Sequence, residues 1–248
     1  MTNRTSTYTL ILLLSTIVLG FVIQSESNIH SHEASVSKIL NGLGEPLPDH
    51  WVEGNAELIQ HGYNLIHEGR TEFPNQVFNE RISKHFVCVD CHNTDREDPV
   101  LTQSDPEGRL AYCIENGIPF LPATTLWGIV NRESWYNGDY QKKYGDLVKA
   151  SRNDLREAIQ LCATECSQGR LLSEQEMLAV LSYLWSLELT WGDLPIHLQT
   201  VDLTSLSSDQ AIAAIKSGYN LASPATFLEP RPIDDRRDVS GNPQTGWD

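Results

Sequence analysis

The sequence has little positive charge, very little methionine and no strand-like alternation of apolar and polar residues. Its 248 residues include 18 lysines and arginines against 33 aspartates and glutamates, a formal charge of −15 at pH 7. This balance argues against nucleic acid as a partner, because phosphate binding needs clustered lysine and arginine. Since the apolar positions recur at helical rather than strand spacing, we expect an all-α fold.

The 2 methionines and 5 cysteines limit the chemistry further. In an exported protein, an odd number of cysteines leaves at least one thiol outside any disulfide. The chain is also 40% hydrophobic, which is too apolar for a wholly disordered protein. We therefore expect a folded chain in which one thiol has another role.

An uncharged apolar run spans residues 8–23, after Arg4 and before Glu26. This order of charge and apolar residues is typical of an export signal. The run is slightly shorter than the ~20 residues that cross a bilayer, and no clear cleavage site follows it. A cleaved signal peptide and an uncleaved membrane anchor over residues 1–24 therefore both stay open. Either places the rest of the chain in the periplasm or on the outer face of the cytoplasmic membrane.

Composition divides the remainder into a polar linker over 25–50, a domain over 51–192 and an extension over 193–248. His30 and His32 in the linker are spaced so that the pair could bind a metal, although an exposed polar segment is the simpler interpretation. We expect helices over 55–68 and 153–166, and a loop over 95–122. A capping box at residues 173–176 predicts a last helix that continues to Gly192. The extension contains one short helical pattern, over 209–217, and ends in a polar, proline-rich segment.

Cys88, Cys91 and His92 form the sequence C-x-x-C-H. This spacing is typical of a covalently attached haem c, because two thiols one turn apart reach the two vinyl groups and the histidine ligates the iron. A chance disulfide or half of a zinc site is the alternative. Zinc would require a second pair of ligands at similar spacing, and C-x-x-C does not recur. We therefore predict one haem attached at this motif.

The second protein ligand of the iron is harder to assign. Met177 is aligned with apolar residues of the predicted last helix, a pattern that favours a core side chain. Between residues 98 and 170 there is no other methionine or histidine, but there are Cys113, Cys162 and Cys166. We predict Cys162 as the ligand and a disulfide between Cys113 and Cys166. Ligation by Cys166 and three free buried thiols stay open as alternatives.

Residues 59–189 resemble one haem domain of the thiosulfate dehydrogenase type of cytochrome c. The resemblance is carried by IQHGYNLIHEGRT, CVDCH, LREAIQLC, SQGRLL and EMLAVLSYLWSL. The same residues are more distantly similar to the haem subunit that loads thiosulfate in sulfur-oxidising bacteria. The resemblance implies a class I-like cytochrome c domain, and in some members a helix cysteine that ligates iron, here Cys162.

The sequence also departs from that family. It has a single C-x-x-C-H, whereas the family carries two haem domains, one for chemistry and one to pass electrons onward. A basic pocket for a sulfur oxyanion is not evident. The nearby candidates are Arg132, Arg152, Arg156 and Arg170, and for Arg152 and Arg156 a solvated helix face is the favoured interpretation.

We expect the first and last helices of the domain to cross, with Gly62 and Tyr63 near residues 181–185 and with Trp127 and Trp135 beside the haem. The predicted function is electron transfer by one haem, with redox proteins as partners, as a subunit of a membrane-associated respiratory or photosynthetic complex. An extension that cannot fold alone is suited to wrap such a partner. Oxidation of thiosulfate or a related sulfur oxyanion is the alternative, and sensing of a small ligand such as nitric oxide is a third.

Overall fold

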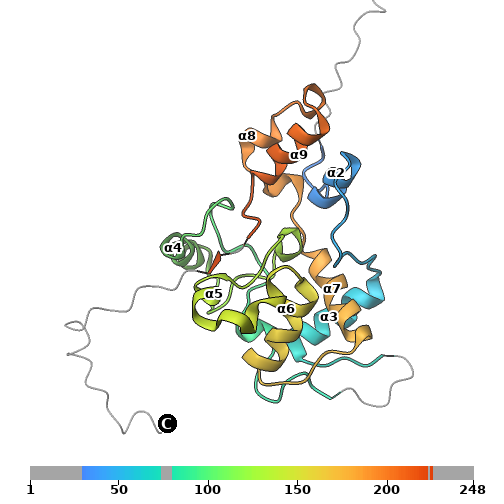
Figure 1. Cartoon of the computed structure of the whole chain (residues 1–248), viewed down its shortest axis with the longest axis vertical. Coiled ribbons are helices and arrows are strands. Elements are labelled where there is room, and N and C mark those ends of the chain that lie inside the picture. Colours follow the sequence, from blue (N-terminus) through green and yellow to red (C-terminus); the bar gives the residue numbers. More distant parts are fainter. Residues whose placement is uncertain (1–29, 74–79, 223, 226–248) are drawn as a thin grey trace, which may run out of the picture.

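A computed structural model describes residues 30–73, 80–222 and 224–225 (Figure 1). The all-α prediction is confirmed, because regular structure in these residues is helical apart from one pair of two-residue strands. Strand β1 (Asn137–Gly138) lies parallel to β2 (Pro224–Ala225). The α-helices are α2 (Val36–Gly42), α3 (Ala56–Glu68), α4 (Pro106–Asn116), α5 (Asp139–Tyr144), α6 (Leu155–Leu161), α7 (Glu174–Ser186), α8 (Ile196–Gln199) and α9 (Ser208–Lys216).

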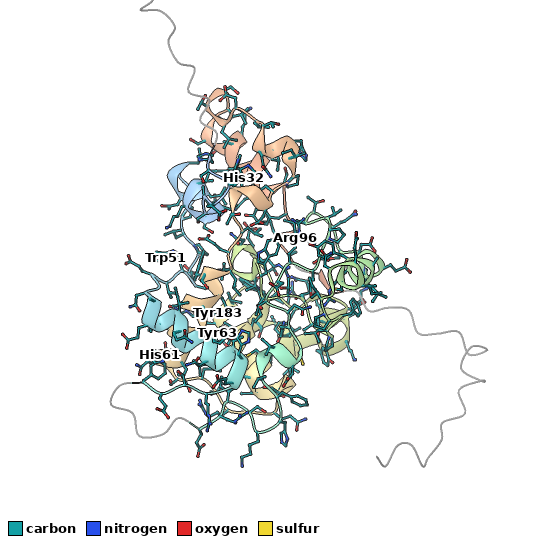
Figure 2. All side chains as sticks on the ribbon, turned by 180° about the vertical axis from the view of Figure 1, so that it is seen from behind. His32, Trp51, His61, Tyr63, Arg96 and Tyr183 are labelled. Atoms are coloured by element: carbon teal, nitrogen blue, oxygen red, sulfur yellow. The ribbon has the colours of Figure 1, made fainter. Side chains whose placement is uncertain are left out.

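Helices α3 and α7 pack directly on each other and organise the larger hydrophobic core. A Cβ atom on Gly62 would lie 2.0 Å from the carbonyl oxygen of Ala179, so only glycine permits this approach. One turn away, the rings of Tyr63 and Tyr183 meet edge to face at 5.7 Å, and the two lie together in Figure 2. The predicted crossing is confirmed at these contacts.

Capping residues explain where the two helices begin and where α3 ends. Asn55 accepts a hydrogen bond from the Leu58 amide, and Gly69 ends α3 in the left-handed conformation. Ser173 and Glu176 form the predicted capping box of α7. Met177 is only 3% exposed and belongs to the larger core, so its interpretation as a core side chain is confirmed.

A second, smaller core joins the two segments that flank the predicted domain. Helices α2, α8 and α9 lie side by side at the top of Figure 1. Val36 donates its amide to the Leu189 carbonyl at 3.0 Å, and Trp191, 2% exposed, packs in this core. His30 meets the Trp191 ring edge-on at 5.1 Å, and the His32 carbonyl accepts the amide of Gly192. The predicted linker is therefore wrong for its described part, which is folded against the chain.

Apart from the short helical pattern over 209–217, the sequence predicts an irregular extension over 193–248, and this is wrong for residues 193–222. They carry α8 and α9, and α9 matches the short pattern predicted over 209–217. Ala211 and Ile215 of α9 are buried against Val36 of α2 and its neighbours. Each of these helices is too short to be stable alone, and only the contact between distant segments buries their apolar faces.

Three element boundaries also differ from those predicted. Residues 95–122 contain α4, which begins at the Asp105 cap and ends at Gly117 in the left-handed conformation. The helix predicted over 153–166 is α6 followed by one π-helical turn, Cys162–Cys166. Helix α7 ends at Ser186 rather than near Gly192, because the chain turns there toward the second core.

The predicted export signal at residues 1–24 lies outside the described residues, as does the proline-rich segment after residue 225. Within the part of the chain that the structure describes, no helix is both long and apolar enough to cross a membrane.

The Gly62 contact gives a direct test of the fold. We expect Gly62→Ala to lower the free energy of unfolding by about 3 kcal/mol, the upper end of the range for overpacked cores, because the new methyl group must push α3 away from the α7 backbone. Gly42→Ala is the control, since a Cβ there meets nothing within 4 Å. Denaturant titrations of both variants measure the difference. Equal stability of the two would contradict the crossing.

Candidate functional site

A cavity of about 310 Å³ opens in the larger core. Its wall is mostly apolar, with Leu65 and Ile66 from α3, Leu155 from α6, and Val180 and Leu184 from α7. The groups on the wall that can carry chemistry come from two places in the sequence. They are Cys88, Cys91 and His92 from one segment, and Tyr136, Tyr140, Cys162 and Cys166 from another.

The C-x-x-C-H residues face this cavity because the chain makes a single 3₁₀ turn, Cys88–Asp90. The carbonyl of Cys88 accepts the amides of Cys91 at 3.1 Å and His92 at 3.0 Å. Asp90 closes the turn by accepting the amide of Val87 at 2.8 Å. Burial raises the pKa of the Cys88 thiol to about 11. The turn thus presents two thiols and an imidazole to one apolar space.

The imidazole of His92 is held in one orientation. Its Nδ1 lies 2.6 Å from the carbonyl oxygen of Thr124. Because a carbonyl oxygen only accepts, Nδ1 carries the proton, and Nε2 keeps its lone pair for a ligand. Burial lowers the pKa of His92, which favours this neutral form. A histidine with this second hydrogen bond is prepared to bind a metal through Nε2.

Cys162 and Cys166 both line the cavity from the π-helical turn after α6. The hydrogen bond from the Cys162 thiol lowers the pKa of Cys166 to about 6, whereas the same interaction raises the pKa of Cys162. Cys166 is exposed, while Cys162 is only partly so. Of the two, Cys166 therefore carries the thiolate near neutral pH.

The sequence interpretation missed Tyr136 and Tyr140 as residues of this wall. The Tyr136 hydroxyl lies 4.0 Å from the Cys166 sulfur and 3.4 Å from the Ala158 carbonyl oxygen. Tyr136 has a φ of +52°, a conformation that a bulky side chain rarely adopts. Strand β1, which begins at the next residue, pairs with β2 and holds the chain there. No sequence motif predicts that these tyrosines line the cavity, because the backbone conformation places them there.

The two tryptophans expected beside the cofactor differ in position. Trp135 lines the cavity and is 5% exposed. Trp127 is not among the lining residues. It packs against the second core, and the Arg96 guanidinium lies 5.7 Å from its ring centroid. Met177, buried in the larger core, does not line the cavity either.

The expected disulfide between Cys113 and Cys166 is wrong in this structure. All five cysteines, which lie within the described residues, are free. Cys113 is buried on α4 and does not line the cavity, whereas Cys166 does. The sequence predicts a loop over 95–122, whereas Cys113 is held on α4, away from the cavity that Cys166 lines.

The four arginines considered for an anion pocket also lie away from the cavity wall, and no lysine or arginine of the described chain lines it. Arg170 is paired with Glu176 at 2.6 Å. Arg132 is half-buried, desolvation lowers the pKa of its guanidinium, and Asp98 and Glu97 are its charged neighbours. The described residues also contain no group of three or more His, Cys, Asp or Glu side chains that could hold a bare metal ion.

Comparisons with protein-family models, with curated proteins and with solved structures found no match to this chain. The residues of the cavity therefore carry the functional argument. They combine two thiols one turn apart, an imidazole with a free Nε2 and a second pair of thiols around an apolar space. This set of groups can bind a flat apolar cofactor covalently and ligate a metal at its centre.

The two cysteines of the π-turn should differ in reactivity. In the chain without cofactor, we expect iodoacetamide to alkylate Cys166 with a rate that rises through about pH 6, because the thiolate forms above that pKa. Cys162→Ala should shift this midpoint upward, since the hydrogen bond that stabilises the thiolate is lost. Peptide mass spectrometry across pH 5–9 measures both. An unchanged midpoint in the variant would contradict the interaction.

Proposed function

We propose that this chain is a mono-haem c-type cytochrome that transfers electrons. The observation that carries the proposal is the turn at Cys88–Asp90, which brings both motif thiols and the Nε2 side of His92 to one apolar cavity. Cys88 and Cys91 would form the two thioethers, and His92 would ligate the iron. The haem would supply one-electron chemistry, and the protein would tune its potential.

The fold proposed around this haem is a class I-like cytochrome c domain over 51–192. Its support is the crossing of α3 and α7 at Gly62, next to the cavity that both helices line. Trp135 and the aliphatic residues of α3, α6 and α7 would exclude water from the haem. A low-dielectric wall strengthens the influence of every nearby charge on the reduction potential.

For the second iron ligand we keep Cys162, the more enclosed of the two cysteines on the π-turn. Cys166 is the alternative, because its thiolate forms at lower pH. The position of Met177 away from the wall gives methionine ligation no support. A thiolate ligand would lower the reduction potential relative to methionine, since it donates more charge to the iron.

Different residues of the cavity wall would bind the haem and orient its ligands. The Thr124 carbonyl, by accepting the Nδ1 proton, fixes the His92 ring and makes Nε2 a stronger donor. The Tyr136 hydroxyl lies near Cys166 and can hold that thiolate in place. Phe86 lines the cavity and is 45% exposed, so this part of the wall reaches the surface where a redox partner can approach.

The partner is proposed to be another redox protein, within or near a membrane complex. A charge of −15 suits an encounter with a basic surface, which would weaken as salt increases. The argument that the extension wraps a partner no longer applies to residues 193–222, because these pack on the chain itself. The export signal over 1–24 remains the basis for proposing a periplasmic or membrane-tethered location.

Oxidation of thiosulfate or a related sulfur oxyanion is the second candidate. The thiolate of Cys166 on the cavity wall favours it, since a sulfur nucleophile can react with such a substrate. The absence of lysine and arginine among the described residues of the wall disfavours it, because a dianion needs cationic partners. Electron transfer is therefore preferred.

Haem attachment is the first test. We expect the full chain, expressed with a c-type cytochrome maturation system, to gain the mass of one haem and to show a haemochrome spectrum. Cys88→Ala and Cys91→Ala should each lose one thioether, whereas Cys113→Ala should keep both, because Cys113 lies away from the cavity. Wild-type protein without covalent haem would contradict the proposal. With the haem attached, rapid reduction by thiosulfate in the absence of any partner would favour the enzyme instead.

The ferric spectrum tests the second iron ligand. With Cys162 bound, Cys162→Ala should abolish the low-spin thiolate signature, and Cys166→Ala should retain it. The reverse result would assign Cys166. Met177→Leu is the control and should leave the spectrum unchanged, because that side chain is buried away from the cavity. Electron paramagnetic resonance of the three variants distinguishes these outcomes, and a change in Met177→Leu alone would contradict thiolate ligation.

A further inference from the structure

Glu97 is a fully buried carboxylate, 0% exposed, that does not line the cavity. It forms an ion pair with Arg109 of α4, whose Nε lies 2.9 Å from Oε1. Burying such a pair costs desolvation energy, so an ion pair inside a protein is weak evidence for added stability. The contacts of Glu97 and Arg109 with other residues indicate a second role for the ion pair.

Those contacts converge on the two chain segments that meet at His92. The Glu97 Oε1 accepts the amide of Thr125 at 2.6 Å, and its Oε2 accepts the side-chain amide of Asn93 at 2.7 Å. Arg109 donates through Nη2 to the carbonyls of Leu121 and Ala123, each at 2.9 Å. One buried pair therefore binds the residue after His92 and several residues around Thr124.

Thr124 is the residue whose carbonyl accepts the Nδ1 proton of His92. It lies between Ala123, which Arg109 holds, and Thr125, which Glu97 holds. The amide of Ala123 also donates to the Cys91 carbonyl at 3.0 Å, so the two segments run against each other. The position of the Thr124 carbonyl relative to the imidazole is thus fixed from both sides by the same ion pair.

We infer that Glu97, through Arg109, is a positioning residue for His92: it holds the Thr124 carbonyl on Nδ1 and so directs Nε2 into the cavity. The inference rests on the proposed haem, because it assigns Nε2 to the iron. It also gives a role to α4, which brings Arg109 to a buried carboxylate twelve residues earlier in the chain. Glu97 touches neither the cavity nor a cofactor, so it acts only through the segments it holds.

Two other charged groups lie in this region and provide a control. Asp98 and Arg132 are electrostatic neighbours of Glu97 and Arg109. Neutralising either Glu97 or Asp98 removes a negative charge near the iron, and both changes should raise the reduction potential. Of these two carboxylates, only Glu97 accepts hydrogen bonds from the Thr125 amide and the Asn93 side chain. Asp98→Asn therefore separates the effect of charge from the effect of position.

The test is the rate at which the His92 Nδ1 proton exchanges with solvent, measured by NMR on the haem-loaded full chain. We expect about tenfold faster exchange in Glu97→Gln, by analogy with the roughly 10- to 100-fold losses of metal affinity or activity that follow when the hydrogen-bond partner of a metal-bound histidine is removed. Gln has one side-chain oxygen, so it loses the bond from either the Thr125 amide or the Asn93 side chain, and one of the two contacts to Arg109. Asp98→Asn should change the potential and leave the exchange rate as in the wild type.

The indole proton of Trp185 serves as an internal reference for opening of the whole domain. It is bonded to the buried His50 carbonyl at 3.1 Å, away from Glu97. Faster exchange of His92 alone supports the positioning role. Equal acceleration of both protons, or no acceleration in Glu97→Gln, would overturn it and leave the ion pair a purely structural feature.

If Glu97→Gln does not fold, Arg109→Lys answers the same question. It keeps the charge of the pair and removes the bonds from the guanidinium to the Leu121 and Ala123 carbonyls. We expect faster exchange at His92 and an unchanged rate at Trp185, and an unchanged rate at both would overturn the inference. Wild-type protein that acquires no haem would instead overturn the proposed function, a result that the mass of the purified chain shows before any variant is made.

Discussion

The close approach of α3 and α7 at Gly62 is the constraint on which the rest of the larger core depends. Because the Ala179 carbonyl occupies the space of a side chain at that position, the two backbones lie nearly in contact. Leu65 and Ile66 of α3 and Val180 and Leu184 of α7 all line the same cavity. A small residue at one position thus sets the separation of two helices that both contribute to the cavity wall.

Within this apolar space, most of the polar groups come from loops and single turns rather than from the long helices α3 and α7. His92 is oriented by a carbonyl from residues 121–126, and that segment is itself held by the pair of Glu97 and Arg109. The thiols of the π-turn and the Tyr136 hydroxyl reach the wall from 135–166. The helices supply shape and exclude water, while the connections supply the groups that can bind and ligate.

The second core changes how the chain is divided. Segments that flank the predicted domain, over 30–50 and 190–219, are folded against each other through Val36, Trp191 and Ile215. The sequence pattern indicates α9 but not α2, and neither is stable alone, because a helix of seven or nine residues needs a partner that buries its apolar face. Their pairing adds a folded unit where composition predicted a linker and an irregular extension.

The sequence by itself determined the local features: the helical class, the caps of α3 and α7, the glycine at their crossing and the C-x-x-C-H turn. Each depends on residues within a few positions of one another, so spacing and side-chain chemistry are sufficient. Only the tertiary structure decided which distant residues meet. It placed Cys162 and Cys166 on the same cavity wall as the C-x-x-C-H residues, left Cys113 and Trp127 elsewhere, and brought Arg109 to Glu97. These contacts join segments far apart in the chain, and no local pattern records them because burial in a shared core is what creates them.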